Sequence, residues 1–468
     1  MGQPVQVPLS ETGNPSSAEA FWRHDPPYHL FLLTSMAFAV VAGFTLAILA
    51  PLSIVLEWGW GRRFLPLTQA HGQVQILGFL GLFIIGMVYR LIPRFSGRRL
   101  SLPALAWASW PMLSLAMVLR LIAQPAGEGL WQRTLLVSSG GLGMLAACAF
   151  ALVVMGTLLH RNSRAGGTGY FFVLAAAFFV LQAGINLRVV VLTAQRGDDI
   201  IRPIEAAGLL HVQLYGFIAM FIIGVASRAI PTISGLARPE IQAKALALVL
   251  AAAVLAFTIA ALWIGSGARS DALLRIEAAA FAALGPIFLA GVWVVGIFRP
   301  AANRLAAASQ HHIWLIRSAF AWLLVAGGLS AYYGVRATAG GEFIPAYGVD
   351  AVRHTVGIGF ASTMIVGMAM LILPEFAIRR ARYPTERWPA LTILALLSAA
   401  AALRVGAAVA MPHWVSTDVY WPMAIGGMLA EGALLLFVAL FVISLLQKNA
   451  IVASIPLRSA RAQGPRQA

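Results

Sequence analysis

The stretch HVQLYGFIAMFIIGVASRAIP, residues 211–231, decides the fold because the chain uses its pattern three times. Counted from His211, the pattern is His-x4-Gly-Phe-x6-Gly-x6-Pro, and its copies start at positions 73, 211 and 354. The copies are filled by Gln73, Gly78, Phe79, Gly86 and Pro93; by His211, Gly216, Phe217, Gly224 and Pro231; and by His354, Gly359, Phe360, Gly367 and Pro374. The starts lie 138 and 143 residues apart, which is too long for one hairpin of a solenoid, so we expect a multi-helix unit used three times.

The composition places these units in a membrane. Hydrophobic residues make up 60% of the 468 residues and charged residues only 11%. A water-soluble protein of this size would need a larger share of polar residues to cover its surface. Apolar runs of about 20 residues or more, enough to cross roughly 30 Å of hydrocarbon, occur twelve times. They are 28–56, 66–92, 103–123, 131–159, 168–195, 205–230, 241–264, 272–298, 312–338, 350–374, 387–411 and 421–446. We therefore predict an all-α integral membrane protein with twelve transmembrane helices, arranged as three pseudo-symmetric repeats of four.

The predicted repeats cover about 28–159, 168–298 and 312–446 of one membrane domain, 28–446. The motif then opens the second, sixth and tenth helix. Residues 1–27 are polar without an apolar core, so we expect a cytoplasmic segment that is not a cleavable signal peptide. The only cysteine, Cys148, excludes an intrachain disulfide and is interpreted as a packing residue.

The net charge of +16 is distributed by topology. Basic residues follow the even-numbered helices, as in the run from Arg90 to Arg99, and they also form the tail 447–468. The alternate loops offset their bases with acids, as Asp198 and Asp199 do beside Arg196. The positive-inside rule then predicts that both termini are cytoplasmic. We interpret the basic excess as a sign of a multi-pass protein of the bacterial cytoplasmic (inner) membrane that touches anionic lipid headgroups, with no nucleic-acid partner.

Three histidines share one depth in this topology. His71, two residues ahead of Gln73, lies with His211 and His354 about one or two turns from the outer ends of their helices. Three imidazoles at one level on three related helices can converge. Ionisable groups inside membranes tend to face an interior site, and neutral imidazole is a common ligand of haem iron and copper. We predict His71, His211 and His354 as metal ligands; the alternative for each is an interfacial or hydrogen-bonded residue.

The glycines and prolines of the motif have structural and functional interpretations. Gly78, Gly216 and Gly359 give a smooth helix surface, which suits both close helix approach and a flat cofactor. The motif prolines are predicted to end each helix where it leaves the membrane.

The architecture, with histidines on the second, sixth and tenth of twelve helices, resembles the catalytic subunit of haem-copper oxidases and nitric oxide reductases. The local sequence resembles the NnrS family, haem- and copper-containing membrane proteins linked to nitric oxide metabolism and nitrosative stress. The residues that carry this second resemblance are His71-Gly-Gln73-x4-Gly78-Phe79 with Gly86, Pro93 and Gly97; His354-Thr-Val-Gly357-x-Gly359 with Met364, Gly367 and Met368; and the segment Trp314 to Gly327 around Trp322.

The superfamily resemblance implies that His71 and His354 ligate a b-type haem and that His211 takes a copper position. Tyr215, four residues after His211, is similar to the His-x-x-x-Tyr of oxidases, and packing is its alternative role. The remaining copper ligands are missing, because no second histidine stands beside His354 and no histidine pair lies at the outer end of the seventh and eighth helices. Gln73 stands where the NnrS pattern often has a histidine, and Glu375-Phe376 replaces its Gly-His-Thr-Gly ending. The chain is therefore expected to hold fewer cofactors than its relatives.

Other polar residues fall inside or beside the predicted spans. The two haem propionates need basic partners, and four arginines near the histidine level can serve or instead extend to the interface: Arg120, Arg188, Arg336 and Arg404. Glu431 is predicted either to handle protons or to pair with an arginine. The pair His311-His312 is assigned to a loop at the cytoplasmic start of the ninth helix.

The sequence thus predicts a haem b membrane protein, with or without copper, that metabolises, detoxifies or senses nitric oxide. If it is an oxidoreductase acting on this gas, the cofactor carries the redox chemistry. Two alternatives stay open. One is a polytopic transporter, although helices 2, 6 and 10 lack the breaks and mid-depth charges that transporters favour. The other is a non-catalytic haem protein for electron transfer or assembly.

Overall fold

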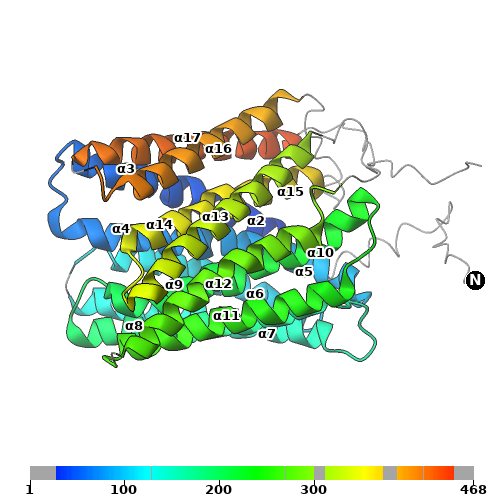
Figure 1. Cartoon of the computed structure of the whole chain (residues 1–468). Helices are drawn as coiled ribbons and strands as arrows, with labels where there is room; N and C mark the ends of the chain where they lie inside the picture. Colours follow the sequence, from blue (N-terminus) through cyan, green and yellow to red (C-terminus); the bar gives the residue numbers. More distant parts are fainter. Residues whose placement is uncertain are drawn as a thin grey trace, which may run out of the picture.

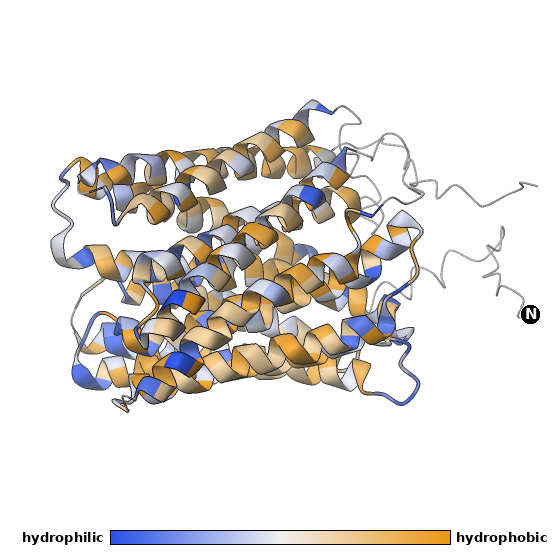
Figure 2. Ribbon diagram, in the orientation of Figure 1, coloured by the Kyte–Doolittle hydropathy of each residue, from blue (hydrophilic) through white to orange (hydrophobic). Residues whose placement is uncertain are grey.

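The computed structural model describes residues 28–127, 129–268, 270–299, 311–372, 387–414 and 416–446. All of the secondary-structure elements in these ranges are helical, and together they form twelve spans that are long and apolar enough to cross a membrane. They run roughly parallel or antiparallel in one bundle (Figure 1), with hydrophilic residues gathered at its two ends and hydrophobic residues along its middle (Figure 2). The predicted all-α membrane fold is confirmed, and each span begins and ends within four residues of its predicted run.

Three of the twelve spans carry the motif, and each is built from three consecutive helical elements. They are α4 (Phe64–Gln73), η3 (Val74–Gly81) and α5 (Leu82–Ser96); α9 (Pro203–His211), η4 (Val212–Ala219) and α10 (Met220–Ser234); and α14 (Ala346–His354), η6 (Thr355–Ser362) and α15 (Thr363–Ile372). The other spans are α2–η1–α3 (Tyr28–Phe38, Ala39–Phe44 and Thr45–Val55), α6 (Pro103–Ala123), α7 (Leu130–Leu158), α8 (Thr168–Arg196), α11 (Glu240–Gly265), α12 (Asp271–Val295), α13 (His312–Gly340), α16 (Trp388–Ala410) and α17 (Tyr420–Leu446).

The motif helices occupy the centre of the bundle. In their most apolar windows 89%, 89% and 83% of residues are buried, whereas no other span exceeds 56%. The η3, η4 and η6 segments also contact one another. The sequence pattern thus marks the helices that the other nine surround. That the twelve helices form three repeats of four stays a prediction.

The middle segment of each motif helix is π-helical, whereas the sequence analysis predicted unbroken α-helices. Each π segment starts directly after a motif start, at Val74, Val212 and Thr355, and contains the Gly-Phe pair of its copy. A π segment shifts the backbone bonding from i→i+4 to i→i+5, and such segments often mark functional sites. Hydrophobic periodicity over so short a stretch does not distinguish the two helix types.

The motif glycines receive bulky side chains from neighbouring helices. A Cβ added to Gly78, Gly216 or Gly359 would lie 3.2, 2.9 or 2.6 Å from an aromatic side chain. These side chains are Phe38, Phe178 and Trp322, from the helix that precedes each motif helix. The second glycine of each copy makes the corresponding contact, as in Gly86 with Phe31, Gly224 with Phe171 and Gly367 with Leu315. Protein side chains therefore fill the space over the Cβ positions of these glycines, which accounts for the glycines by packing. That they also border a cofactor stays a prediction.

Two of the motif prolines, Pro93 and Pro231, do not end their helices, contrary to the prediction. Pro93 and Pro231 lie inside α5 and α10, which continue for three more residues. Each helix ends at a glycine in the left-handed conformation, Gly97 with φ 67° and Gly235 with φ 73°, which glycine adopts without steric cost. Pro374, Glu375 and Phe376 lie outside the described residues, as do the segments 1–27 and 447–468.

The glycine contacts can be tested by substitution. We expect Gly224→Val to lower the free energy of unfolding by about 1–3 kcal/mol, because its Cβ would lie 2.6 Å from the Cβ of Phe171. Gly328→Ala is the matched control in α13, since nothing lies within 4 Å of an added Cβ there. Thermal unfolding in detergent measures both. Equal effects of the two substitutions would contradict the packing role of the motif glycine.

Candidate functional site

His354 is held at its Nδ1 by two oxygen atoms of Asp350. Its Nδ1 lies 2.9 Å from the backbone oxygen of Asp350 and 3.1 Å from Asp350 Oδ1. A carbonyl oxygen cannot donate, so Nδ1 carries a hydrogen, and in the neutral imidazole the free lone pair is therefore on Nε2. The second oxygen of Asp350 lies 2.8 Å from Arg404 Nη2 in α16. Such an orienting carboxylate is typical of histidines that ligate metals.

His71 has the same tautomer for a similar reason. Its Nδ1 lies 2.7 Å from the backbone oxygen of Gly43, so Nδ1 donates and Nε2 is left as an acceptor. Gly43 belongs to η1, a π-helical segment of the first span in which backbone bonding departs from the α-helical ladder. The second span therefore offers a neutral imidazole with a defined ligating nitrogen.

His71 and His354 share one interior region. His71 interacts electrostatically with His354, Asp350 and Arg404. On both helices the residues beside the imidazoles keep partial exposure although most of the helix is buried. A Cβ added to Gly72 or Gly357 would meet nothing within 4 Å. The two imidazoles thus lie in the part of the bundle where α4 and α14 lie (Figure 1), next to glycine positions that neighbouring side chains leave open.

His211 lies in a different environment. It is 2% exposed, and its ring stacks on Phe257 of α11 with centroids 3.7 Å apart and planes 9° apart. Tyr215 lies on its other side at 4.6 Å between centroids. Neither His211 Nε2 nor the Tyr215 hydroxyl has a hydrogen-bond partner. The Arg353 guanidinium acts electrostatically on both residues. We call these surroundings of His211, formed by Phe257, Tyr215 and the nearby cation Arg353, the aromatic chamber.

The chamber around His211 does not fit copper. A copper ion in a protein takes several nitrogen or sulfur ligands, whereas the described residues contain no group of three or more His, Cys, Asp and Glu side chains that could hold a metal. The ring of Phe257 covers one face of the imidazole, and a guanidinium repels a second cation. The expectation that His211 ligates copper is therefore not supported by its donor set. The donor set of His71 and His354 does fit a haem iron with two axial imidazoles.

The four arginines predicted to meet propionates are spread over different places. Arg404 pairs with Asp350 beside His354, and its Nη1 has no hydrogen-bond partner. Arg120 is buried in a separate pocket next to Gln73. Arg188 is exposed, and Arg336 is exposed and donates to the hydroxyl of Tyr332 at 3.1 Å. Only Arg404 lies beside one of the two candidate haem ligands.

The remaining predicted polar residues are Glu431, which has a local hydrogen-bond partner, and His311 and His312, which contact each other. Glu431 Oε1 lies 3.3 Å from Thr45 Oγ1, a hydroxyl of the first span, and no ion pair within the described part of the chain joins Glu431 to an arginine. The rings of His311 and His312 lie 4.2 Å apart at the start of α13. The loop assignment is wrong for His312, which is the first residue of the helix, and both side chains are buried with ring nitrogens that have no hydrogen-bond partner.

Sequence reasoning missed several residues of the site. Asp350 could have been found, because a carboxylate four residues before a helical histidine lies on the same face. Arg353 is adjacent to His354 in the sequence, so its nearness to the histidine level could also have been predicted. Phe257 meets His211 across two helices, and no local sequence signal predicts such a contact.

Neither protein family descriptions nor curated proteins match this sequence. Among solved structures, the chain is similar to a haem-copper terminal oxidase whose dimer was determined by cryo-EM. The TM-score is 0.63 at 12% identity, over 92% of this chain and 86% of that chain. The likeness is one of fold. It confirms the oxidase-like architecture predicted from the helix and histidine positions, while membership of the NnrS family stays a prediction.

The coupling between Asp350 and Arg404 can be measured with a double-mutant cycle. We expect the double variant Asp350→Asn with Arg404→Gln to lose less free energy of unfolding than the sum of the losses in the two single variants. The difference, which is the coupling energy, should be about 1–3 kcal/mol. The control is Arg202→Gln, because Arg202 is exposed and lies 3.6 Å from Asp198, a surface pair that contributes about 0–1 kcal/mol. Additive effects at Asp350 and Arg404, measured by thermal unfolding, would show that the pair is not coupled.

Proposed function

We propose that this chain binds one b-type haem between its second and tenth helices, with His71 and His354 as the two axial ligands. The observation that carries the proposal is the matched state of the two imidazoles. Both donate Nδ1–H to a backbone carbonyl, both can present Nε2 as an acceptor, and the two rings lie close enough to interact electrostatically. The oxidase-like fold supports it, because the similar solved structure is that of a haem-copper oxidase.

The residues around the site would orient the imidazole of His354 and balance the charge of the haem propionates. Asp350 fixes the ring of His354 through Nδ1 and is itself held by Arg404. Arg404 keeps one amino group without a partner, which suits a propionate. A bound b-type haem would supply one-electron redox chemistry.

If His71 and His354 both bound one haem iron, the iron would have no open position for a gas. His71 and His354 therefore favour electron transfer over gas binding as the direct role of this site. The similarity of the first and third motif copies to the NnrS family supports placing that electron transfer in nitric oxide metabolism or the nitrosative stress response. A direct oxidoreductase acting on nitric oxide has less support, because the His211 chamber lacks a ligand set. A transporter is not favoured either, since Asp350 is paired with Arg404.

The charge pattern supports a place in the bacterial cytoplasmic membrane, with both termini in the cytoplasm and the histidine level near the outer face. At that level the haem would be reachable by an electron donor in either the membrane or the periplasm.

Histidine substitutions test the haem proposal. We expect His71→Ala and His354→Ala each to remove the low-spin spectrum of the reduced protein, because each deletes one axial ligand. His211→Ala should keep that spectrum, since His211 lies in a separate aromatic chamber. Pyridine haemochrome content and reduced-minus-oxidised spectra of protein purified in detergent measure this. The control is His160→Ala in an exposed loop. An unchanged low-spin spectrum in both the His71 and His354 variants would refute bis-histidine ligation.

Metal content tests the assignment at His211. After expression with added copper, we expect iron at about one per chain and copper well below one per chain, because a single imidazole beside a guanidinium does not hold copper. Elemental analysis of the purified protein measures both, and His211→Ala should leave the copper content unchanged. Stoichiometric copper that is lost in this variant would contradict the assignment.

A further inference from the structure

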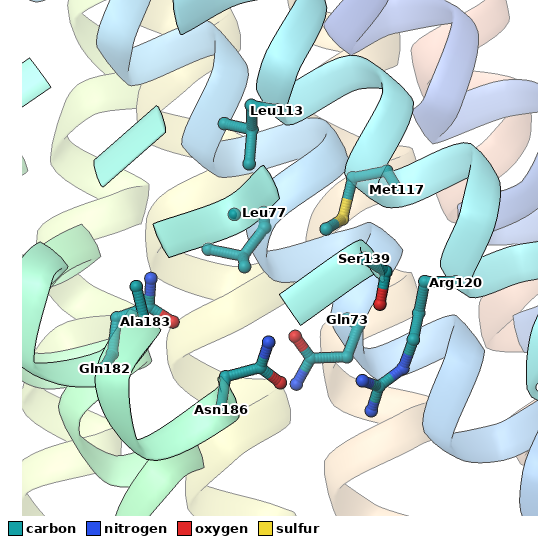
Figure 3. Close-up of a pocket in the computed structure, with 10 residues that line it drawn as sticks. Gln73, Leu77, Leu113, Met117, Arg120, Ser139, Gln182, Ala183 and Asn186 are labelled. Atoms are coloured by element: carbon teal, nitrogen blue, oxygen red, sulfur yellow. The ribbon is translucent and has the colours of Figure 1, made fainter. Parts of the chain in front are cut away.

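A second buried polar site lies on the other side of the second helix, away from His71. It is a largely enclosed pocket among the second, third, fourth and fifth spans (Figure 3). Polar groups of Gln73, Arg120, Ser139 and Asn186 gather at one end, and Leu77, Leu113 and Met117 close the other. Its free space is about that of one water-sized particle. The proposed haem site does not use this pocket.

Arg120 is the charged group of the pocket. Its side chain is 2% exposed, and its Nε donates to Gln124 Oε1 at 2.6 Å, while Nη2 has no hydrogen-bond partner. None of the ion pairs found among the described residues involves Arg120. A buried cation without a counter-charge is strongly unfavourable. Arg120 therefore needs an anion that the described side chains do not provide.

The third copy of the motif shows what is missing. Arg404 stands in the helix after the third motif helix, as Arg120 stands in the helix after the first. Arg404 is neutralised by Asp350, which lies four residues before the motif start His354. Four residues before the motif start Gln73 stands Gln69, a neutral amide. The first copy thus keeps the arginine and lacks the acid.

Neutral amides surround Arg120 in place of an acid. Gln124 donates to Gln69 Oε1 at 2.6 Å, and Gln69 is tied to the backbone of Ile201 by two hydrogen bonds, which closes the pocket toward the end of the bundle. Inside the pocket, Asn186 is 7% exposed and its Oδ1 has no partner. A rotation of this amide would present Nδ2–H to an anion. A water molecule could bridge Asn186 and Arg120, but it would leave the charge uncompensated.

We propose that this pocket binds one small monovalent inorganic anion, with chloride as the size that fits, held by Arg120 Nη2 and the amide of Asn186. The free space is about that of one water-sized particle, so a monatomic ion fits it better than an oxyanion such as nitrate. The apolar side chains of Leu113 and Met117 tolerate a weakly hydrated halide. The ion takes the place that Asp350 holds beside Arg404.

The test is thermal unfolding in detergent across a chloride titration at constant ionic strength, with gluconate as the replacing anion. We expect the unfolding midpoint to rise with chloride and saturate, because a ligand that binds only the folded state stabilises it. Arg120→Gln should lower the apparent chloride affinity by about tenfold or more. Gln124→Glu should abolish the chloride dependence, because it places a carboxylate where Oε1 now accepts from Arg120. Arg336→Gln, at an exposed arginine, is the matched control and should behave as the wild type.

Line broadening of the ³⁵Cl resonance by the wild type, absent with Gln124→Glu, gives a second readout that does not depend on unfolding. A wild type with equal midpoints in chloride and gluconate would overturn the proposal. A chloride dependence that persists in both Arg120→Gln and Gln124→Glu would overturn it as well. Neither result bears on haem binding by His71 and His354, so the two proposals fail separately.

Discussion

The burial of three helices on nearly all sides is the constraint from which the rest of the structure follows. A helix that meets no lipid must be packed by neighbouring helices along its whole length, and in a bilayer this packing favours small residues at close contacts. Gly78, Gly216 and Gly359 meet that need by receiving an aromatic side chain from the preceding helix. Polar groups on such helices cannot reach water, so each must find a partner inside the bundle or hold a ligand.

The first residue of the motif is a buried or half-buried polar residue in all three copies, and its partners differ from copy to copy. The third copy starts with an imidazole oriented by a carboxylate, the second with an imidazole stacked on Phe257, and the first with Gln73. Gln73 exchanges hydrogen bonds with Gln213, which also donates to Gln182 at 2.9 Å. One backbone arrangement therefore carries three pockets of different chemistry. The haem proposal concerns the region between the first and third copies, and the anion proposal concerns the first alone.

The fold was predictable because membrane helices can be recognised by their length and hydropathy, and because the repeated motif indicated which three helices are central. The level of the histidines followed from the same topology. The π-helical segments could not be foreseen, since hydrophobic periodicity over eight residues does not distinguish a π-helix from an α-helix. Proline was a misleading signal at Pro93, because the helix continues to Ser96 and ends at a glycine. The lone cation at Arg120 is visible only once its neighbours in space are known.

Charge balance links the candidate haem ligands to their surroundings. Arg353 and Arg404 lie near Asp350, so the region beside His354 carries two positive charges and one negative charge. An unbalanced charge inside a membrane protein is costly. A ferric b-type haem with two ionised propionates has a net charge of minus one, which cancels this surplus. A copper ion near His211 would instead add to the positive charge of Arg353. The same electrostatic argument thus favours an anionic porphyrin between His71 and His354 and disfavours a metal cation in the aromatic chamber.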